Sequence, residues 1–385
     1  MRLVFIGLSL SSSWGNGHAT TYRALLKGLA ARGHDILFLE RNQPWYADNR
    51  DMPEPDFCQL RIYDSIAQLW SYAPEVAAAD AVIIGSYVPQ AADVIAWAAC
   101  THHGALCFYD IDTPVTLRQL ATGGAEYLHP TLIPLFDFYL SFTGGPTLDL
   151  LERRYGACRA EALYCSVDAE TYRPLQVPRK WDLGYLGTYS ADRQPVLERL
   201  LLEPARRAPE RRFIVAGPQY PDDIDWPANV ERIEHLAPAN HPEFYASCAW
   251  TLNVTRRDMV RAGYSPSVRL FEATACGTPV LSDAWAGIED VLEPGREILI
   301  MRDSDDVLAA LAIDDAARTA IGQAGRRRTL RQHTGVQRAA ELEAWLRSCE
   351  RKSEADHWLD SPFADMVEAG AVGHEREGVT LAPGF

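Results

Sequence analysis

Three things are scarce in this chain of 385 residues, and each scarcity argues against a class of protein. No apolar run approaches the roughly 20 residues that cross a bilayer, so we expect no membrane span. Lys and Arg number 37 against 52 Asp and Glu, and the net charge of −15 argues against nonspecific nucleic-acid binding. The eight cysteines include no C-x-x-C pair, which favours buried free thiols in a reducing cytoplasm over disulfides or zinc. We therefore expect a cytoplasmic protein, and a locally basic pocket is still compatible with the acidic total.

The length and composition indicate a folded protein of two domains. A chain of this size is too long for one small core. Its 47% hydrophobic and 23% charged residues are normal for a globular protein. The first ten residues, MRLVFIGLSL, hold one basic residue and lead directly into a Gly-rich loop, so they predict a buried first strand and not a signal peptide.

Short apolar runs alternate with amphipathic stretches along most of the chain, which is typical of parallel sheets covered by helices on both faces. The runs of the first half lie at 3–7, 35–40, 81–84, 105–109 and 137–142. The series restarts at 183–187, 213–217, 249–254, 278–282 and 297–301. The pattern predicts an α/β fold of two doubly wound, Rossmann-like domains. Ligands of such sheets bind at the carboxyl ends of the strands, so a cleft between the two domains is the expected site.

The domain junction is expected at 168–180, DAETYRPLQVPRK, where two prolines and several polar residues interrupt the pattern. We predict an N-terminal domain at 1–170 and a C-terminal domain at 171–335. A helix at 336–350 could cross back to the first domain, and 351–385 is a polar tail. A homodimer remains open at this point.

The most informative stretch is 253–283, NVTRRDMVRAGYSPSVRLFEATACGTPVLSD. It leaves a strand, crosses a loop rich in Arg, Gly, Ser and Pro, and enters a short predicted helix at 267–275. A helix N-terminus beside serines and arginines is suited to an anion. Glu272, about two turns into the helix, adds a carboxylate that can accept hydrogen bonds from sugar hydroxyls. Together these features predict a site for a nucleotide sugar.

Several residues of this half are candidates for binding the donor, and each has an alternative role. Glu272 could bind ribose hydroxyls or be a solvated helical glutamate, and Arg269 could contact phosphate or pair with Glu272. Ser267 could simply cap its helix, which is compatible with presenting free N–H groups to a phosphate. Arg193 follows the first strand of the second domain and offers a fork for phosphate oxygens, or it is only the start of a helix. The further donor candidates near these positions are Gly187, Thr188, Asn253, Thr255, Ser265 and Pro266.

The first domain supplies the candidates for a catalytic base. His18 begins the predicted helix after the first loop and could remove a proton from an acceptor hydroxyl, or its ring could pack against Trp14. Asp110 and Asp112 flank a strand end, and they could orient an acceptor, replace His18 as the base, or cap the next helix. No third acidic or His ligand adjoins them, so no metal is predicted.

With these stretches in hand, the chain resembles GT-B glycosyltransferases, and within them the CgeB-like spore-maturation family. The similar pieces are GNGHATTYRALLKGLAARGHDI, DIDTPVTL, LYCSVDAETYRP, LGTYSADRQP and the long block from Asn253. The resemblance implies two Rossmann-like domains, a donor held mainly by the second, an acceptor held mainly by the first, and usually no metal. It also implies that Arg256 contacts the diphosphate and that backbone groups at His235 and Leu236 face the base. We also expect Gly15 and Gly17 of the first loop to contact the donor.

One departure from the family pattern concerns stereochemistry. Many retaining GT-B enzymes carry two glutamates with seven residues between them, and the second matches Glu272. The position of the first is Tyr264 here. The acidic partner near the transferred sugar is therefore absent, and the sequence does not support assigning retention.

The sequence predicts a glycosyltransferase that uses a UDP- or dTDP-linked sugar, needs no further cofactor, and acts on an unidentified acceptor. Three alternatives remain. One is a sugar-nucleotide epimerase or hydrolase of the same shape, and another is a non-catalytic protein that binds nucleotide sugars. The third is an NAD enzyme, because Gly15-x-Gly17 partly matches a dinucleotide fingerprint, but Thr20 occupies the place of its third glycine.

Overall fold

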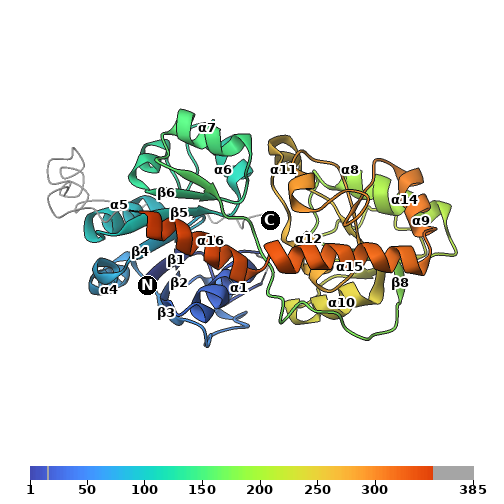
Figure 1. Cartoon of the computed structure of the whole chain (residues 1–385), viewed down its shortest axis with the longest axis horizontal. Helices are drawn as coiled ribbons and strands as arrows, with labels where there is room; N and C mark the ends of the chain where they lie inside the picture. The colour runs from blue at the N-terminus through green and yellow to red at the C-terminus, as the bar shows by residue number, and fades with distance from the viewer. Residues whose placement is uncertain (15–16, 350–385) are drawn as a thin grey trace.

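The computed structural model describes residues 1–14 and 17–349, whose strands form two separate parallel sheets (Figure 1). The strands of the first sheet are β1 (Arg2–Gly7), β2 (Asp35–Arg41), β3 (Gln59–Tyr63), β4 (Ala81–Gly85), β5 (Ala105–Asp110), β6 (Phe138–Ser141) and β7 (Ala160–Ala162). Those of the second are β8 (Trp181–Leu186), β9 (Phe213–Ala216), β10 (Val230–Ile233), β11 (Cys248–Asn253), β12 (Val280–Ser282) and β13 (Leu299–Ile300). The predicted tail at 351–385 and Gly15 lie outside the described residues.

The order of strands explains where ligands are expected. The first sheet runs β3-β2-β1-β4-β5-β6-β7 and the second runs β10-β9-β8-β11-β12-β13. In each sheet the chain first adds strands toward one edge and then returns to add the rest toward the other edge. This reversal of strand order falls between β1 and β4 in the first sheet and between β8 and β11 in the second. Ligands of open α/β sheets bind outside the carboxyl ends of the strands at such a switch point. The predicted pair of doubly wound, Rossmann-like domains is confirmed.

Helices cover both faces of each sheet. Those of the first domain are α1 (His18–Ala31), α2 (Pro44–Ala47), α3 (Ile66–Trp70), α4 (Ala73–Ala78), α5 (Ala91–Thr101), α6 (Thr113–Leu120), the 3₁₀ turn η1 (Pro130–Leu135) and α7 (Pro146–Tyr155). Alternate residues of β1 divide between two cores. Leu3 and Phe5 pack with α1, whereas Val4 and Ile6 belong to the core that also takes in residues of α3 to α7. This period of two is what a strand buried on both faces requires.

The second domain is built in the same way. Its helices are α8 (Gln194–Leu197), the π-helical turn η2 (Glu198–Leu202), α9 (Glu203–Arg207), the 3₁₀ turn η3 (Pro238–Asn240), α10 (His241–Ser247), α11 (Arg257–Ala262), α12 (Val268–Ala275), α13 (Ile288–Val291), α14 (Ser304–Leu311) and α15 (Asp315–Gln332). One core joins the sheet to α10 and α12, and the other joins it to α8, η2, α9 and α14. Within the described part of the chain, no helix is both long and apolar enough to span a membrane.

The chain passes between the domains twice, and the two crossings lie side by side. The first crossing follows β7 and the second joins α15 to α16 (Gly335–Ser348). Val167 accepts a backbone hydrogen bond from Gly335 at 3.0 Å and donates one to His333 at 3.1 Å. Helix α16 then lies on the first domain beside α1, where Leu342 and Leu346 enter the core around Phe5 (Figure 1). The C-terminal helix thus belongs structurally to the N-terminal domain.

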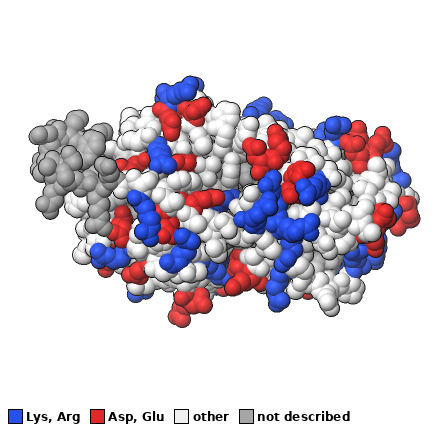
Figure 2. All heavy atoms as spheres, viewed as in Figure 1, with Lys and Arg blue, Asp and Glu red and all other residues white. Residues whose placement is uncertain are grey.

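Charge is distributed unevenly over the surface. Figure 2 shows acidic and basic side chains interspersed on both domains, with Lys and Arg gathered close to where the domains meet. The net charge of −15 is therefore an average that allows positive potential near the junction.

Candidate active site

A cleft of about 390 Å³ lies between the domains, at the carboxyl ends of both sheets. Fifteen of the eighteen residues predicted for the site line it: Gly17, His18, Asp112, Gly187, Thr188, Arg193, His235, Leu236, Thr255, Arg256, Ser265, Pro266, Ser267, Arg269 and Glu272. Two do not line it, Asp110 and Asn253, and Gly15 lies outside the described residues. The structure therefore brings residues more than 250 positions apart in the sequence to one cavity.

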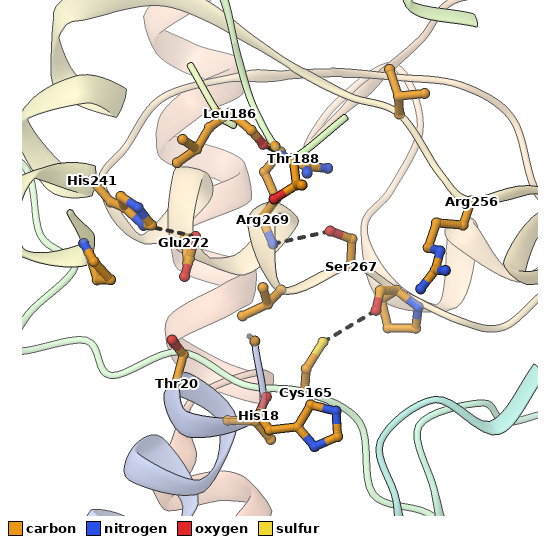
Figure 3. A pocket seen from close by; sticks show the side chains of 18 of the residues that line it. His18, Thr20, Cys165, Leu186, Thr188, His241, Arg256, Ser267, Arg269 and Glu272 are labelled. Carbon is orange, nitrogen blue, oxygen red and sulfur yellow. Dashed lines mark hydrogen bonds and ion pairs between the residues drawn. The ribbon is translucent and has the colours of Figure 1, made fainter. Parts of the chain in front are cut away.

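Helix α12 points its first turn into the cleft. Ser267 is its N-cap, and the Ser267 hydroxyl accepts a hydrogen bond from the Arg269 N–H at 3.3 Å (Figure 3). The preceding Pro266 carbonyl accepts one from the Cys165 thiol at 3.3 Å, and Ser265 accepts one from Thr143 of the first domain at 3.0 Å. The cap and the loop before it are thus fixed from both sides of the junction. The predicted capping role of Ser267 and its position at the cleft coexist.

Glu272 lies deep in the cleft with 4% of its surface exposed. The Tyr245 hydroxyl donates a hydrogen bond to its carboxylate at 2.9 Å, and His241 Nδ1 lies 4.0 Å from the same oxygen. A buried carboxylate is costly unless it is hydrogen-bonded, so these α10 side chains stabilise it and fix its direction. Glu272 is therefore not the solvated helical glutamate that the sequence left open.

Arg269 is one turn before Glu272, but its guanidinium is held by other groups. Its Nε donates to the Leu186 carbonyl at 2.5 Å and its Nη1 donates to Asn253 Oδ1 at 3.0 Å. Arg269 and Glu272 do not form an ion pair within 4.0 Å in the part of the chain that the structure describes. Asn253 is fully buried, so it contributes to the site by orienting Arg269 and not by reaching the cleft itself.

The loop after β8 comes very close to Arg269. A Cβ atom on Gly187 would lie 2.8 Å from Arg269 Nη2, so the absence of a side chain there leaves room for the guanidinium. Arg193 Nη2 donates to the Thr188 carbonyl at 2.7 Å, which holds that arginine against the loop. Gly217 in turn has φ of +145° and packs against the Gly187 carbonyl, where a Cβ would be 2.1 Å away. Two glycines thus let two neighbouring loops approach each other at the switch point.

Thr255 and Arg256 follow β11 on the other side of the switch point. The Thr255 N–H and hydroxyl both donate to the Asp283 carboxylate, at 3.1 and 2.8 Å. Burial raises the pKa of Asp283, and these hydrogen bonds from Thr255 act in the opposite direction. Arg256 extends toward the first domain, where its Nη1 lies 3.8 Å from Asp112 Oδ2. The loop after β11 therefore carries a cation that reaches across the cleft.

Residues 235–241 form the remaining wall of the second domain. His235, Leu236, Pro238 and His241 line the cleft, and the His241 ring contacts the Leu236 carbonyl at 3.3 Å. His241 and Tyr245 were not predicted from the sequence to lie at the cleft. The pattern HPEFYAS offers a signal only once α10 is known to pack on α12, because that contact turns both side chains toward Glu272.

The first domain contributes His18 and Asp112 to the opposite wall. His18 is 3% exposed, and its ring lies edge-on to Tyr87 with 5.3 Å between centroids. Burial lowers the pKa of His18 to about 4, because it disfavours the charged ring, so the imidazole is neutral at pH 7. Asp112 accepts a hydrogen bond from the Tyr87 hydroxyl at 3.2 Å, and burial raises its pKa despite the opposing effect of Arg256.

Asp110 occupies a different environment from Asp112. It is fully buried, and it accepts hydrogen bonds from Tyr139 at 2.5 Å and Thr116 at 2.8 Å. Burial raises its pKa to about 6. Because Asp110 does not line the cleft, its position indicates support of the loop that carries Asp112, not contact with a substrate.

Tyr264 replaces the acidic residue expected from other GT-B enzymes, and its ring lies between two glycine backbones. A Cβ on Gly145 of the first domain would lie 2.5 Å from Tyr264 Cδ2, and one on Gly287 would lie 2.3 Å from Cδ1. The Tyr264 carbonyl also accepts a hydrogen bond from the Gly144 N–H at 2.9 Å. Tyr264 has φ of +48°, an unusual backbone conformation for a residue of its size. The side chain thus joins the two domains at the edge of the cleft.

The described residues contain no group of three or more His, Cys, Asp and Glu side chains placed to hold a metal ion. The polar groups that converge on the cleft include three arginines, a capped helix N-terminus, the buried carboxylates of Asp112 and Glu272, and the imidazole of His18. Cations and N–H groups on one wall suit a phosphorylated ligand. The Glu272 carboxylate can accept hydrogen bonds from hydroxyl groups of such a ligand.

Comparison with known proteins bears on the fold and on part of the second domain. Residues 193–344 match a family model described as glycosyl transferase-like. Among solved structures, sucrose-phosphate synthase from Thermosynechococcus elongatus is 13% identical with a TM-score of 0.63, covering 90% of this chain and 98% of its own. Anabaena HepE in complex with UDP-glucose is 14% identical with a TM-score of 0.62, covering 90% and 100%. Trehalose-6-phosphate synthase OtsA is 13% identical with a TM-score of 0.65, covering 91% and 100%.

The fold is therefore GT-B, as the sequence resemblance predicted. A search of curated proteins found no significant match.

Proposed function

We propose that the protein is a GT-B glycosyltransferase that transfers a sugar from a UDP- or dTDP-linked donor to an acceptor held by the first domain. The observation that carries this proposal is the pair of buried side chains on α12. Glu272 is fixed by Tyr245, and Arg269, one turn nearer the helix N-terminus, is fixed by Leu186 and Asn253. A carboxylate for the ribose and a cation for the diphosphate are thus presented from one rigid helix.

The diphosphate would lie between the N-terminus of α12 and the loops after β8 and β11. Arg193, Arg256 and Arg269 all line this part of the cleft. As the glycosidic bond breaks, negative charge grows on the leaving diphosphate, and groups that are already oriented stabilise it without reorganisation. The base would lie against the wall around His235 and Leu236.

The comparisons support this proposal in two ways. Residues 193–344, which match the glycosyl transferase-like model, include the whole of the candidate donor site except Gly187 and Thr188 in the second domain. HepE, which shares the fold over its full length, was solved with UDP-glucose. The CgeB-like assignment rests on the sequence motifs and is part of the proposal.

The acceptor oxygen would attack the anomeric carbon while the bond from that carbon to the diphosphate oxygen breaks. The proton of the acceptor hydroxyl must then pass to a base. We assign His18 this role, because its ring lines the cleft on the wall opposite the candidate donor site. Asp112 is the second candidate. His18→Ala should leave UDP affinity unchanged and lower turnover by about 10² to 10⁴. Persistent turnover in that variant would transfer the role to Asp112.

We further propose that transfer needs no metal ion, because arginines and helix N–H groups supply the positive charge. Turnover should then survive dialysis against a chelator, and a loss that Mg²⁺ restores would contradict this part of the proposal. The cytoplasm is the proposed location. The exposed Cys100 and Cys158 form no disulfide, as expected for thiols that a reducing compartment maintains.

A nucleotide-release assay separates this function from its rivals. The protein is incubated with a panel of UDP-, dTDP- and GDP-sugars, with and without candidate acceptors, and released nucleoside diphosphate is measured. A transferase releases it in proportion to acceptor. Acceptor-independent release indicates a hydrolase, conversion of the donor without release indicates an epimerase, and binding without either indicates a non-catalytic protein.

A further inference from the structure

Two tryptophans stand exposed on the first domain, on segments that follow the first two strands of its sheet. Trp14 is 49% exposed and Trp45 is 38% exposed. Trp14 lies in the loop after β1, next to Ser13, which lines the cleft. Trp45 lies in α2, directly after β2. Because β1 and β2 pair in parallel, both segments leave the sheet at its carboxyl edge, where the cleft opens.

A buried carboxylate fixes the loop that carries Trp14. Glu40 at the end of β2 is fully buried and accepts hydrogen bonds from the Leu10 and Ser11 N–H groups at 2.7 and 2.9 Å. The Ser11 hydroxyl donates to it as well, at 2.5 Å. A buried charge with several donors holds those donors in place, since each lost bond leaves it less compensated.

The same loop is also tied to the segment that follows Trp45. Asp51 accepts two hydrogen bonds from Ser13, from the N–H at 2.9 Å and from the hydroxyl at 2.8 Å. The Arg23 guanidinium also donates one hydrogen bond to each Asp51 oxygen, both at 2.8 Å. These contacts lower the pKa of Asp51 to about 2 and outweigh the effect of its burial. The two tryptophan-bearing segments are therefore held in one arrangement before any ligand arrives.

Trp45 is backed by an aromatic ring, and the side-chain amide of Asn49 donates a hydrogen bond to its carbonyl at 3.1 Å. The buried Tyr46 lies edge-on to it, with 5.9 Å between ring centroids. Close in sequence, Arg50 donates to Asn42 at 2.6 Å, and Asn42 donates to Asp64 at 2.7 Å. A flat apolar face beside amides and charges matches a sugar ring, which has an apolar C–H face and hydroxyl groups around its edge.

We propose that Trp14 and Trp45 form a stacking platform for the acceptor, and that the acceptor is a carbohydrate chain whose rings lie on the two indoles. This inference rests on the proposed function, because it places the acceptor on the first domain. A protein acceptor would be expected to need a contiguous apolar patch. Here the two exposed indoles stand on separate segments, the loop after β1 and α2, which suits ring-by-ring contact with an oligosaccharide.

The test is binding of the full-length protein, saturated with UDP, to an array of neutral and charged oligosaccharides that spans the common hexose, pentose and amino-sugar linkages. The wild type should bind a subset of them. Trp14→Ala and Trp45→Ala should each weaken that binding about tenfold, as expected for loss of one aromatic contact. Trp70→Ala is the matched control. Trp70 is also 49% exposed, but it lies at the end of α3, outside the loops after β1 and β2, and should have no effect.

Calorimetry with UDP separates failure of this inference from failure of the proposed function. Wild type and all three variants should bind UDP equally and unfold at similar temperatures, because the substituted side chains are exposed. If UDP binds but no oligosaccharide does, or if Trp14→Ala and Trp45→Ala bind the array as the wild type does, the platform is wrong. Tryptophan-dependent binding of 4-methylumbelliferone with a silent array would also overturn it, in favour of an aromatic acceptor. Absence of UDP binding would instead overturn the proposed function.

Discussion

Arg256 Nη1 lies 3.8 Å from Asp112 Oδ2 across the cleft. A candidate phosphate contact of the second domain is thus paired with a candidate base of the first domain. The pair neutralises both charges in the absence of substrate. A diphosphate would compete with Asp112 for the arginine, so donor binding would release the carboxylate toward the acceptor.

The first prediction concerns this competition. Asp112→Asn removes the competing charge and should strengthen UDP binding by about twofold to fivefold, the size expected for a partly exposed ion pair. Arg256→Ala removes a charge-assisted contact to phosphate and should weaken UDP binding by about tenfold. Isothermal titration with UDP measures both. Arg118→Ala is the control, because Arg118 forms a 2.8 Å interdomain pair with Asp258 but does not line the cleft. Equal UDP affinity in all four proteins would show that Arg256 does not meet the phosphates.

The second prediction is a dependence of stability on pH. The pKa of His18 falls from its ordinary value of 6.5 to about 4 on folding, because the ring is buried. As the pH drops from 6.5 to 4, the unfolded chain takes up this proton before the folded one does. The folded state should therefore lose up to about 3 kcal/mol through His18 across this window, and nothing above it.

Urea unfolding of the wild type and His18→Gln at pH 7.5 and pH 4.5 measures this effect. Asp110 acts in the opposite direction, because its pKa is raised to about 6. Its contribution is common to both proteins and cancels in their difference. His18→Gln should thus gain stability relative to the wild type at the lower pH. A difference that does not change with pH would mean that folding does not lower the pKa of His18.

The third prediction tests the contact of Tyr264 with Gly145. Gly145→Ala places a methyl group where the Tyr264 ring lies, so the domain contact must loosen. Turnover should fall by about tenfold to a hundredfold, because small displacements of reacting groups are costly. UDP affinity should not change, since the donor site is in the other domain.

Gly33→Ala is the matched control for this substitution. Gly33 also has positive φ, +81° against +58° for Gly145, but nothing lies within 4 Å of its added Cβ. Gly33→Ala should lose about 1–2 kcal/mol of stability through backbone strain, and Gly145→Ala should lose more, because its φ of +58° and ψ of −140° lie outside the left-handed helical region. If turnover falls equally in both, the effect comes from strain and not from the position of Tyr264.

The sequence predicted much of the fold because its signals are local. Buried parallel strands are nearly continuous apolar runs, and helices carry caps such as Ser267, so β1, β11 and α12 could be placed within a few residues. Strands of weaker pattern were harder. The run of β3, QLRIY, has charged and exposed positions and was not predicted.

The lining of the cleft was predicted in part, again because local signals mark where strands end. Residues on the loops after strands were predicted correctly to line the cleft, because all strands of a parallel sheet end at the same edge. Tyr245 and His241 were missed, because their contacts with Glu272 depend on how α10 packs on α12. Asp110 was placed among the candidates because it follows a strand, but its two hydrogen bonds to Thr116 and Tyr139 turn it into the core. Tertiary packing, and not the sequence pattern, decides whether such a side chain points into the cleft or into the core.

The most direct test of the whole account is the affinity of Glu272→Ala for UDP, measured by isothermal titration. Glu289→Ala, which removes an exposed glutamate from α13 of the same domain, is the control. If Glu272 clasps the ribose, its loss should weaken UDP binding by about tenfold to a hundredfold, as for a hydrogen bond to a charged group, while Glu289→Ala binds as the wild type does. A folded Glu272→Ala protein that binds UDP as tightly as the wild type would contradict the account.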